Sequence, residues 1–242
     1  MIGLAELLIV LVLSGSLYLC LSPPAWYTSS QKLTFIRRYG GLVKQQQLKD
    51  LVGGIGLNLA RAANYQEEPL EFFVLKSQVP NAFAWDSKTV FVTIGLLELV
   101  ESKDELAAVL AHEIGHLAAG HPEARAMNRA QSILLSSSFS GMGWVMNKVG
   151  SLVSRAGEAA FSRAQERDAD RLGITYLLRG GYDPHAAARV LEKLRRLRVA
   201  SGAPESSLQD LLSTHPVDSE RIATVENIAR KVCLKFPTRP MQ

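Results

Sequence analysis

The segment Leu110-Ala111-His112-Glu113-Ile114-Gly115-His116-Leu117 contains the pattern His-Glu-x-x-His. Residues four apart lie on one face of a helix, so both imidazoles can reach one metal ion. Glu113 projects beside them, where its carboxylate can take a proton from a water at the metal. The segment therefore predicts a helical zinc site with His112 and His116 as metal ligands and Glu113 as the catalytic general base.

The residues around this pattern predict the helix that carries it. Ser102-Lys103-Asp104-Glu105 has the form of a capping box, in which the Ser102 hydroxyl accepts from the Glu105 amide and the Glu105 carboxylate reaches back to the Ser102 amide. Gly120 and Pro122 are expected to end or kink the helix. We therefore expect a helix from Ser102 to about Ala119.

A catalytic zinc needs three protein ligands and one open position. His121 lies five residues beyond His116, about 140° around an uninterrupted helix, so we reject it as the third ligand. It is better interpreted as a group that caps the helix end or supports a ligand from behind.

A better third ligand lies in the segment Ser162–Asp170, where Glu166 and Asp170 are four residues apart on one predicted helix face. One inward carboxylate can complete the zinc sphere, and a second, one turn along, can bind the outer nitrogen of a ligand histidine. Two acids at this spacing are more often solvated helix surface. The His-Glu-x-x-His pattern upstream favours the zinc interpretation.

With these motifs the chain resembles the HtpX and CAAX-prenyl-protease family of zinc metallopeptidases, which are gluzincins, and among them the compact BepA-like and Oma-type branches. The resemblance runs from about Leu48 to Ile228 and includes Pro80–Ala84, Val90–Leu97 and Thr214-His215-Pro216 with Arg221. It implies Glu166 as the third metal ligand and Asp170 as the group that orients a ligand histidine. It also implies that His215 and Arg221 stabilise the oxyanion and that a strand formed by Asn81, Ala82, Phe83 and Ala84 binds the substrate backbone. Without the zinc site, His215-Pro216 would be an ordinary helix N-terminal turn and Arg221 a surface cation.

The expected fold is α+β and mainly α-helical, with a small β-sheet packed beside the His-Glu-x-x-His helix and the glutamate-ligand helix. Strands are expected at Glu71–Leu75 and Lys88–Thr93, and none after residue 95. Ser136–Gly157, rich in Ser and Gly, is either a helical hairpin that covers the core or a lid or membrane-contacting element near the site. Hydrophobic periodicity and turn signals predict the following helices: Gln45–Ala63, Glu123–Leu135, Trp144–Ser154, Glu158–Arg179, Pro184–Val199 and Asp218–Val232.

Composition and the N-terminus predict two parts. The chain has 242 residues, of which 47% are apolar and 21% charged, which is typical of a folded globular protein. Its net charge of +4 is too small and scattered to favour nucleic-acid binding. The apolar run Met1–Leu21 predicts a membrane anchor or secretory signal within residues 1–30, and residues 31–242 form the expected zinc metallopeptidase domain.

These features favour a zinc-dependent endopeptidase that holds one Zn²⁺ and cleaves protein or peptide substrates. The resemblance implies misfolded envelope proteins as substrates and a location in the cell envelope, on the periplasmic side. One rival is a gated zinc-site protein that acts as a chaperone or binding module, with Ser136–Gly157 or His215 plugging the site. Another is a helical scaffold without metal. The sequence leaves the oligomeric state and the side of the membrane open.

Overall fold

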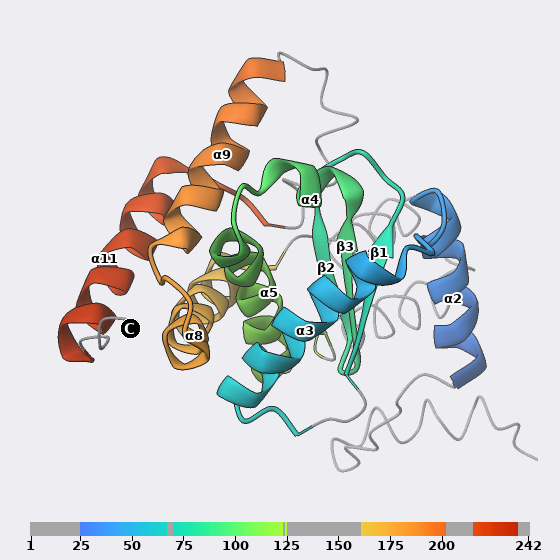
Figure 1. Ribbon diagram of the computed structural model, residues 1–242, viewed down its shortest axis with the longest axis horizontal. Coiled ribbons are helices and arrows are strands. Elements are labelled where there is room, and N and C mark those ends of the chain that lie inside the picture. The colour runs from blue at the N-terminus through green and yellow to red at the C-terminus, as the bar shows by residue number, and fades with distance from the viewer. Residues whose placement is uncertain (1–24, 67–69, 123, 125–160, 202–214, 237–242) are drawn as a thin grey trace, which may run out of the picture. The chain divides into compact units, whose positions relative to one another are not determined.

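A computed structural model describes residues 25–66, 70–122, 124, 161–201 and 215–236 (Figure 1). The chain divides into two compact units, Met1–Leu33 and Thr34–Gln242. Within the described residues, no helix is both long enough and apolar enough to cross a bilayer. Several predictions fall outside the described residues: the apolar run at residues 1–21, the helix at Trp144–Ser154, the segment Ser136–Gly157 and, apart from Ala124, the helix at Glu123–Leu135.

The predicted fold class is confirmed, because the described elements are mostly helices with one small sheet. Their order is α2 (Ala25–Arg38), α3 (Gln46–Ala62), β1 (Glu71–Leu75), β2 (Ala82–Asp86), β3 (Thr89–Thr93), α4 (Ile94–Leu99), α5 (Lys103–Ala118), α8 (Arg163–Gly180), α9 (Ala186–Ser201) and α11 (Ser219–Lys235).

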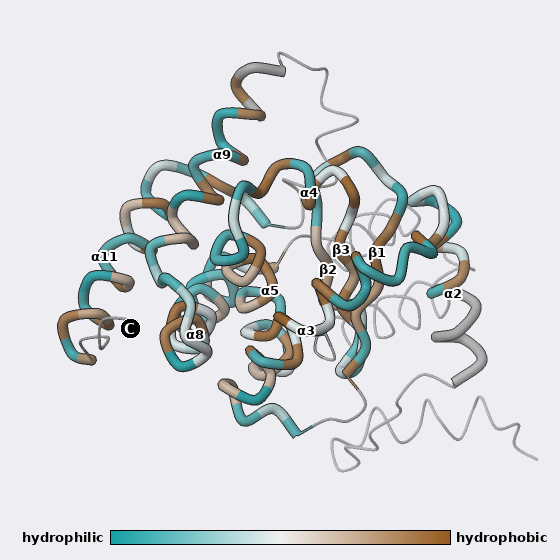
Figure 2. Tube along the Cα trace, in the orientation of Figure 1, coloured by the Kyte–Doolittle hydropathy of each residue, from teal (hydrophilic) through white to brown (hydrophobic). Residues whose placement is uncertain are grey.

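The sheet has the order β1-β3-β2, with β1 parallel and β2 antiparallel to β3, so β2 is an edge strand. Val90 and Val92 of β3 face the core shared with α3 and α5, where apolar residues gather on the strands and on α5 (Figure 2). Phe91 points to the opposite face, against Phe73 and the ring of Phe35. The edge strand β2 packs against α5, which is the helix of the His-Glu-x-x-His pattern.

Helices α5 and α8 approach each other closely because each has a glycine at the contact. A Cβ on Gly115 would lie 2.7 Å from the Ala169 carbonyl oxygen, and a Cβ on Gly173 would lie 3.0 Å from the Ala111 carbonyl oxygen. Real Cβ atoms rarely come so near to backbone. The two missing methyl groups therefore set the distance between the helix that carries the histidines and the helix that carries Glu166.

The helix starts differ in part from the prediction. The Ser102 hydroxyl accepts from the Glu105 amide as expected, but the Glu105 carboxylate accepts from the Glu101 amide (2.7 Å) and not from that of Ser102. A complete capping box forms instead at Ser162, with Gln165 as its partner. Consequently α8 begins at Arg163, and the predicted start at Glu158 was too early.

Glu105 is the centre of a buried ionic contact between α5 and α9. Its carboxylate lies 2.8 Å from Nζ of Lys193, while the residue is only 4% exposed. Burial alone would raise the pKa of Glu105, but the Glu101 amide and Lys193 hold it below its usual value. A lowered pKa in the folded state means that this carboxylate stabilises the fold above its unfolded pKa, and that the stabilisation is lost as the pH falls through the folded pKa.

Glu105→Gln is expected to lower the free energy of unfolding at neutral pH by about 1–3 kcal/mol. The reason is that the buried carboxylate loses its charge and with it the ionic hydrogen bond from Lys193. The difference from wild type should shrink below about pH 4, where the wild-type carboxylate also loses its charge. Urea titrations at several pH values measure this. Glu101→Gln is the matched control, because Glu101 also contacts Lys193 but its side chain is 80% exposed. An equal loss in both variants, or a difference independent of pH, would contradict the prediction.

Candidate metal centre

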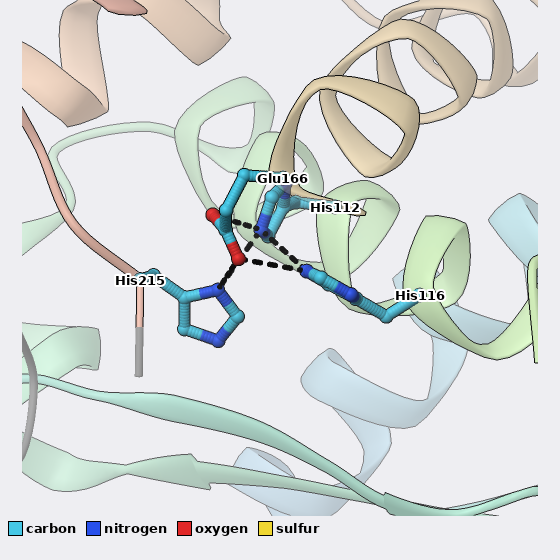
Figure 3. A group of neighbouring side chains, drawn as sticks. All are labelled: His112, His116, Glu166 and His215. Atoms are coloured by element: carbon cyan, nitrogen blue, oxygen red, sulfur yellow. Dashed lines mark hydrogen bonds and ion pairs between the residues drawn. The ribbon is translucent and has the colours of Figure 1, made fainter. Parts of the chain in front are cut away.

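Four side chains that can bind a metal converge beside the edge strand. They are His112 and His116 from α5, Glu166 from the first turn of α8, and His215, which precedes α11. One potential ligand atom from each lies within 4.8 Å of the others, and Figure 3 shows the side chains pointing toward one another. We call this the four-residue cluster.

Three of its members have the spacing of zinc ligands. Nε2 of His112 and Nε2 of His116 are 3.1 Å apart. The Glu166 carboxylate lies 3.3 Å from Nε2 of His116 and 3.5 Å from Nε2 of His112. Two atoms bound about 2.1 Å from a tetrahedral ion lie roughly 3.4 Å apart. The donor set and its spacing therefore fit one zinc ion.

His215 lies where a fourth ligand would be. Its Nδ1 is 3.2 Å from Nε2 of His112 and 2.9 Å from Oε1 of Glu166. Its other ring nitrogen, Nε2, is 3.6 Å from Oε1 of Glu113. The ring thus lies between the atoms that could bind a metal and the carboxylate that the sequence predicts to be the general base.

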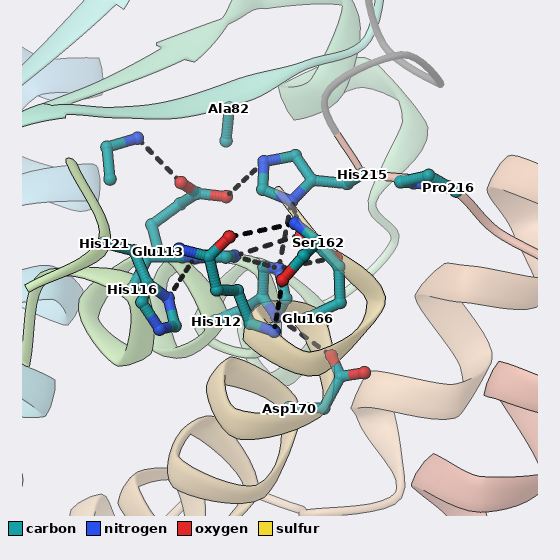
Figure 4. Close-up of polar contacts among 12 residues, drawn as sticks. Ala82, His112, Glu113, His116, His121, Ser162, Glu166, Asp170, His215 and Pro216 are labelled. Atoms are coloured by element: carbon teal, nitrogen blue, oxygen red, sulfur yellow. Dashed lines mark hydrogen bonds and ion pairs between the residues drawn. The ribbon is translucent and has the colours of Figure 1, made fainter. Parts of the chain in front are cut away.

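Each α5 histidine has a partner at its outer nitrogen (Figure 4). Oδ1 of Asp170 lies 2.9 Å from Nδ1 of His112, and Nδ1 of His121 lies 2.9 Å from Nδ1 of His116. The ring of Phe161 stacks on His116 at 3.9 Å between centroids. Such partners fix the tautomer and the orientation of a ligand histidine.

Arg221, in the first turn of α11, contacts two carboxylates of α8, those of Glu166 and Asp170. It donates to Asp170 from Nε at 2.9 Å and from Nη2 at 2.8 Å, and its Nη1 lies 2.6 Å from Oε2 of Glu166. It also donates to the carbonyl of Pro216. The resemblance predicts that Arg221 stabilises the oxyanion. In the structure, Arg221 contacts mainly the carboxylates of Asp170 and Glu166.

Glu113 is only 2% exposed and is anchored to the edge strand. The Ala84 amide of β2 donates to Oε2 of Glu113 at 2.7 Å. Glu113 therefore keeps one oxygen on β2 and directs the other toward His215 (Figure 4).

The four residues predicted to bind the substrate backbone occupy different positions. Asn81 precedes β2, and its Oδ1 accepts from the Ala82 amide at 2.9 Å. Both residues line a cavity next to the four-residue cluster. The Phe83 ring lies on the aromatic face of the sheet, 5.0 Å from the Phe35 ring between centroids. Ala84 holds Glu113, as described above.

Comparison with known proteins assigns a family to this arrangement. A model of peptidase family M48 matches residues 44–229, which include every residue of the site described above. The chain belongs to peptidase family M48. This membership confirms the resemblance inferred from the sequence.

Three similar proteins are named as proteases or as a metalloendopeptidase. This M48 chain is 32% identical to the beta-barrel assembly-enhancing protease of Escherichia coli K12 over 216 residues, 82% of the chain and 43% of that protein. It is 33% identical to the mitochondrial metalloendopeptidase OMA1 of Schizosaccharomyces pombe over 157 residues, 64% of the chain and 45% of that protein. The metalloprotease LoiP of E. coli K12 is 27% identical over 163 residues, 65% of the chain and 62% of that protein. The chain spans less than half the length of the first two relatives.

Burial and charge give the ionisable groups of the M48 site very different pKa values. Burial opposes a charge on His112, but its contacts with Asp170 and Glu166 raise its pKa to about 10. Burial lowers the pKa of His116 to about 2. Burial alone would raise the pKa of the Glu166 and Asp170 carboxyls. Charge at His215 and contacts with the histidines nevertheless hold that of Glu166 far below its usual value, and His112 and Arg221 lower that of Asp170 to about 2.

Sequence reasoning did not find all the residues of this M48 site. For His121 the sequence left two interpretations, a helix cap or a support for a ligand histidine. The structure shows a contact with His116, which forms because the left-handed turn at Gly120 (φ 67°) brings His121 back toward that ring. Nothing in the sequence indicated Phe161. For the α9 side chains that line the cavity, the sequence predicts only a helix at Pro184–Val199.

Proposed function

We propose that this chain is a zinc metalloendopeptidase that hydrolyses peptide bonds in protein substrates. The observation that carries the proposal is the convergence of His112, His116 and Glu166. The two Nε2 atoms are 3.1 Å apart, and the two oxygens of the Glu166 carboxylate lie 3.3 and 3.5 Å from them, with the Glu113 carboxylate nearby. Membership in a peptidase family and the proteases among its relatives support it.

The residues of the chain divide the work. Bound zinc would polarise the scissile carbonyl and acidify a water molecule. His112, His116 and Glu166 would hold the ion, while Asp170 and His121 keep the two rings in place. Glu113 takes the proton of the attacking water at its free oxygen and passes it to the leaving nitrogen. His215 and Arg221 are the candidate donors to the developing oxyanion.

The substrate is proposed to bind along the edge strand. An extended peptide can add beside β2 through main-chain hydrogen bonds, which give affinity with little sequence preference. This suits misfolded or membrane-associated proteins in the cell envelope. Residues 1–30 would then act as a membrane anchor or export signal, and residues 31–242 as the peptidase domain.

The test is zinc content together with casein cleavage by the purified full chain. We expect about one zinc per chain, cleavage that a chelator abolishes, and recovery when zinc is added back. Protein that binds zinc stoichiometrically yet cleaves neither casein nor peptides would overturn the proposal. Protein that binds no zinc would overturn it as well.

A second candidate, a gated site, is favoured by one observation. Nδ1 of His215 is 2.9–3.2 Å from atoms of Glu166 and His112, so it can fill the position that an attacking water needs. In that case the chain acts as a binding module while His215 is in place, and as a protease only when His215 leaves.

His215→Ala separates the two roles of this residue. If His215 stabilises the oxyanion, kcat should fall by about 10²–10³-fold with zinc retained. If it closes the site, kcat should rise instead. We expect the fall, measured with casein and a short peptide. His185→Ala is the matched control, because His185 pairs with Glu226 away from the four-residue cluster. Unchanged kcat in His215→Ala would remove the residue from both roles.

A further inference from the structure

The stretch that contains α2 and the first turn of α3 carries only one sign of charge. Between Leu7 and Lys49 there is no Asp or Glu, whereas five residues are basic: Lys32, Arg37, Arg38, Lys44 and Lys49. Of the 27 basic residues in the chain, the other 22 are matched by all 23 acidic ones. The net positive charge therefore comes from this one stretch, although basic residues as such are spread over the chain.

A turn of two glycines brings one more basic residue beside this stretch. The Gly41 amide donates to the Ile36 carbonyl at 2.9 Å, which closes α2, and Gly40 and Gly41 both have positive φ angles, 80° and 94°. The chain then runs beside the end of β1, where the Lys76 amide donates to the Gly41 carbonyl at 3.0 Å. A Cβ on Gly40 would lie 3.4 Å from Cβ of Lys76. The end of α2 and the end of β1 therefore lie side by side.

Three exposed cations flank this turn: Arg37 in the last turn of α2, Lys44 just after the glycines, and Lys76. We call these three residues the basic turn. Within the described part of the chain, none of the three pairs with a carboxylate. Exposed cations that no acid neutralises add their fields and attract a negatively charged surface. The basic turn is therefore suited to an anionic partner.

Aromatic rings lie next to the basic turn. The Tyr39 ring, just before the two glycines, is 4.6 Å from the Phe35 ring and 5.1 Å from the Phe83 ring between centroids. The Phe35 ring is also 4.6 Å from the ring of Trp85, which is partly exposed. Tyr and Trp are enriched at the level of lipid headgroups, because their rings are apolar with one polar group. Exposed cations beside such rings favour a bilayer surface over a dissolved anion.

We infer that the basic turn binds the surface of a bilayer that contains anionic phospholipids, with Arg37, Lys44 and Lys76 at the phosphate groups. Arg37 follows the apolar run at residues 1–21 by only sixteen residues, so a run that enters a membrane keeps the turn tethered near the surface. The contact needs neither zinc nor peptide cleavage and goes beyond the proposed peptidase function. Since Phe83 belongs to β2, a bound turn also holds the edge strand near the bilayer.

Vesicle sedimentation with the purified full chain tests the inference. Vesicles of phosphatidylcholine alone are compared with vesicles of equal parts phosphatidylcholine and phosphatidylglycerol. The triple variant Arg37→Gln, Lys44→Gln, Lys76→Gln should bind the anionic vesicles roughly 100-fold more weakly than wild type, because each basic residue contributes about fivefold. Salt at about 1 M should remove this difference, since the Debye length then falls to about 3 Å.

A second triple variant is the matched control. Lys103→Gln, Arg179→Gln, Lys231→Gln removes the same charge from exposed positions on α5, α8 and α11 and should bind the anionic vesicles far more tightly than the first variant. If both triple variants lost the same amount of binding, net charge alone would explain the attraction and the inference would be overturned.

Lysine labelling decides the case in which the apolar run alone holds the protein on both kinds of vesicle. A water-soluble acylating reagent is added to the vesicle-bound wild-type chain, and mass spectrometry gives the rate at each lysine. Lys44 and Lys76 should react about fivefold more slowly on the anionic vesicles than on the neutral ones. Lys103 and Lys231, also exposed, should react at the same rate on both.

Two labelling results would contradict the inference. Equal labelling of Lys44 and Lys76 on both kinds of vesicle would show that the basic turn does not touch the headgroups. Equal slowing by inorganic phosphate without vesicles would show a site for free phosphate instead of a bilayer contact. Since labelling uses the wild-type chain, it decides even if a triple variant does not fold, and it stands apart from any failure to bind zinc or to cleave casein.

Discussion

Replacing Glu113 by glutamine is expected to lower kcat by at least about 10²–10⁴-fold and to leave the zinc content unchanged. Glutamine has nearly the same size and can still accept from the Ala84 amide, which donates to Glu113 at 2.7 Å. It cannot take a proton from the attacking water. The measurement is casein cleavage with zinc analysis on the same samples.

Glu98→Gln is the control for this experiment, because Glu98 lies on α4 with an exposed side chain. It should match wild type in both zinc content and rate. If Glu113→Gln kept most of its activity, Glu113 would not be the general base. If it lost its zinc, the carboxylate would act mainly in holding the metal.

Glu166→Ala is expected to lose most of the zinc together with the activity. Its carboxylate is within 3.5 Å of Nε2 of both His112 and His116, so its removal takes away one of the three proposed ligands. Asp170→Ala should weaken zinc binding by only about 10–100-fold, since Asp170 contacts the outer nitrogen of His112. Excess metal should therefore rescue part of the activity of Asp170→Ala and little of that of Glu166→Ala.

Metal titrations of the two purified variants, read by zinc content and by activity, provide the comparison. Thermal unfolding of the metal-free proteins is the control for stability, because each substitution also takes a partner from Arg221. If Asp170→Ala lost its zinc while Glu166→Ala retained it, the two acids would exchange roles.

Much of the fold could be predicted from local pattern. Apolar periodicity found α3, and β-branched and aromatic residues found β1 and β3, all within a residue or two of their bounds. The six-residue helix α4 is too short to show a clear period, and α2 was not predicted. α8 begins five residues after the predicted start, because the capping box of Ser162 and Gln165 fixes the first turn of the helix there.

The residues of the site also fall into two groups: those that local sequence pattern predicts and those that it does not. His112, Glu113 and His116 are close in sequence, and the spacing of Glu166 and Asp170 is a helical turn, so pattern alone could nominate all five. Their partners depend on contacts between segments far apart in the chain. Arg221 is fifty-one residues from Asp170, and the Ala84 amide is twenty-nine residues from Glu113. Such pairings follow from how the helices and the edge strand pack, which periodicity does not describe.

The close contact of α5 and α8 makes the positions between the two histidines part of the metal chemistry. A methyl group on Gly115 would press on the Ala169 carbonyl, which belongs to the same helix as Glu166. The helices would have to move apart, and the carboxylate would recede from the imidazoles although every ligand was still present. The residues written as x in His-Glu-x-x-His are thus not interchangeable in this protein. Gly115 is one of them, and the space between the two helices at this position does not admit even one more carbon atom.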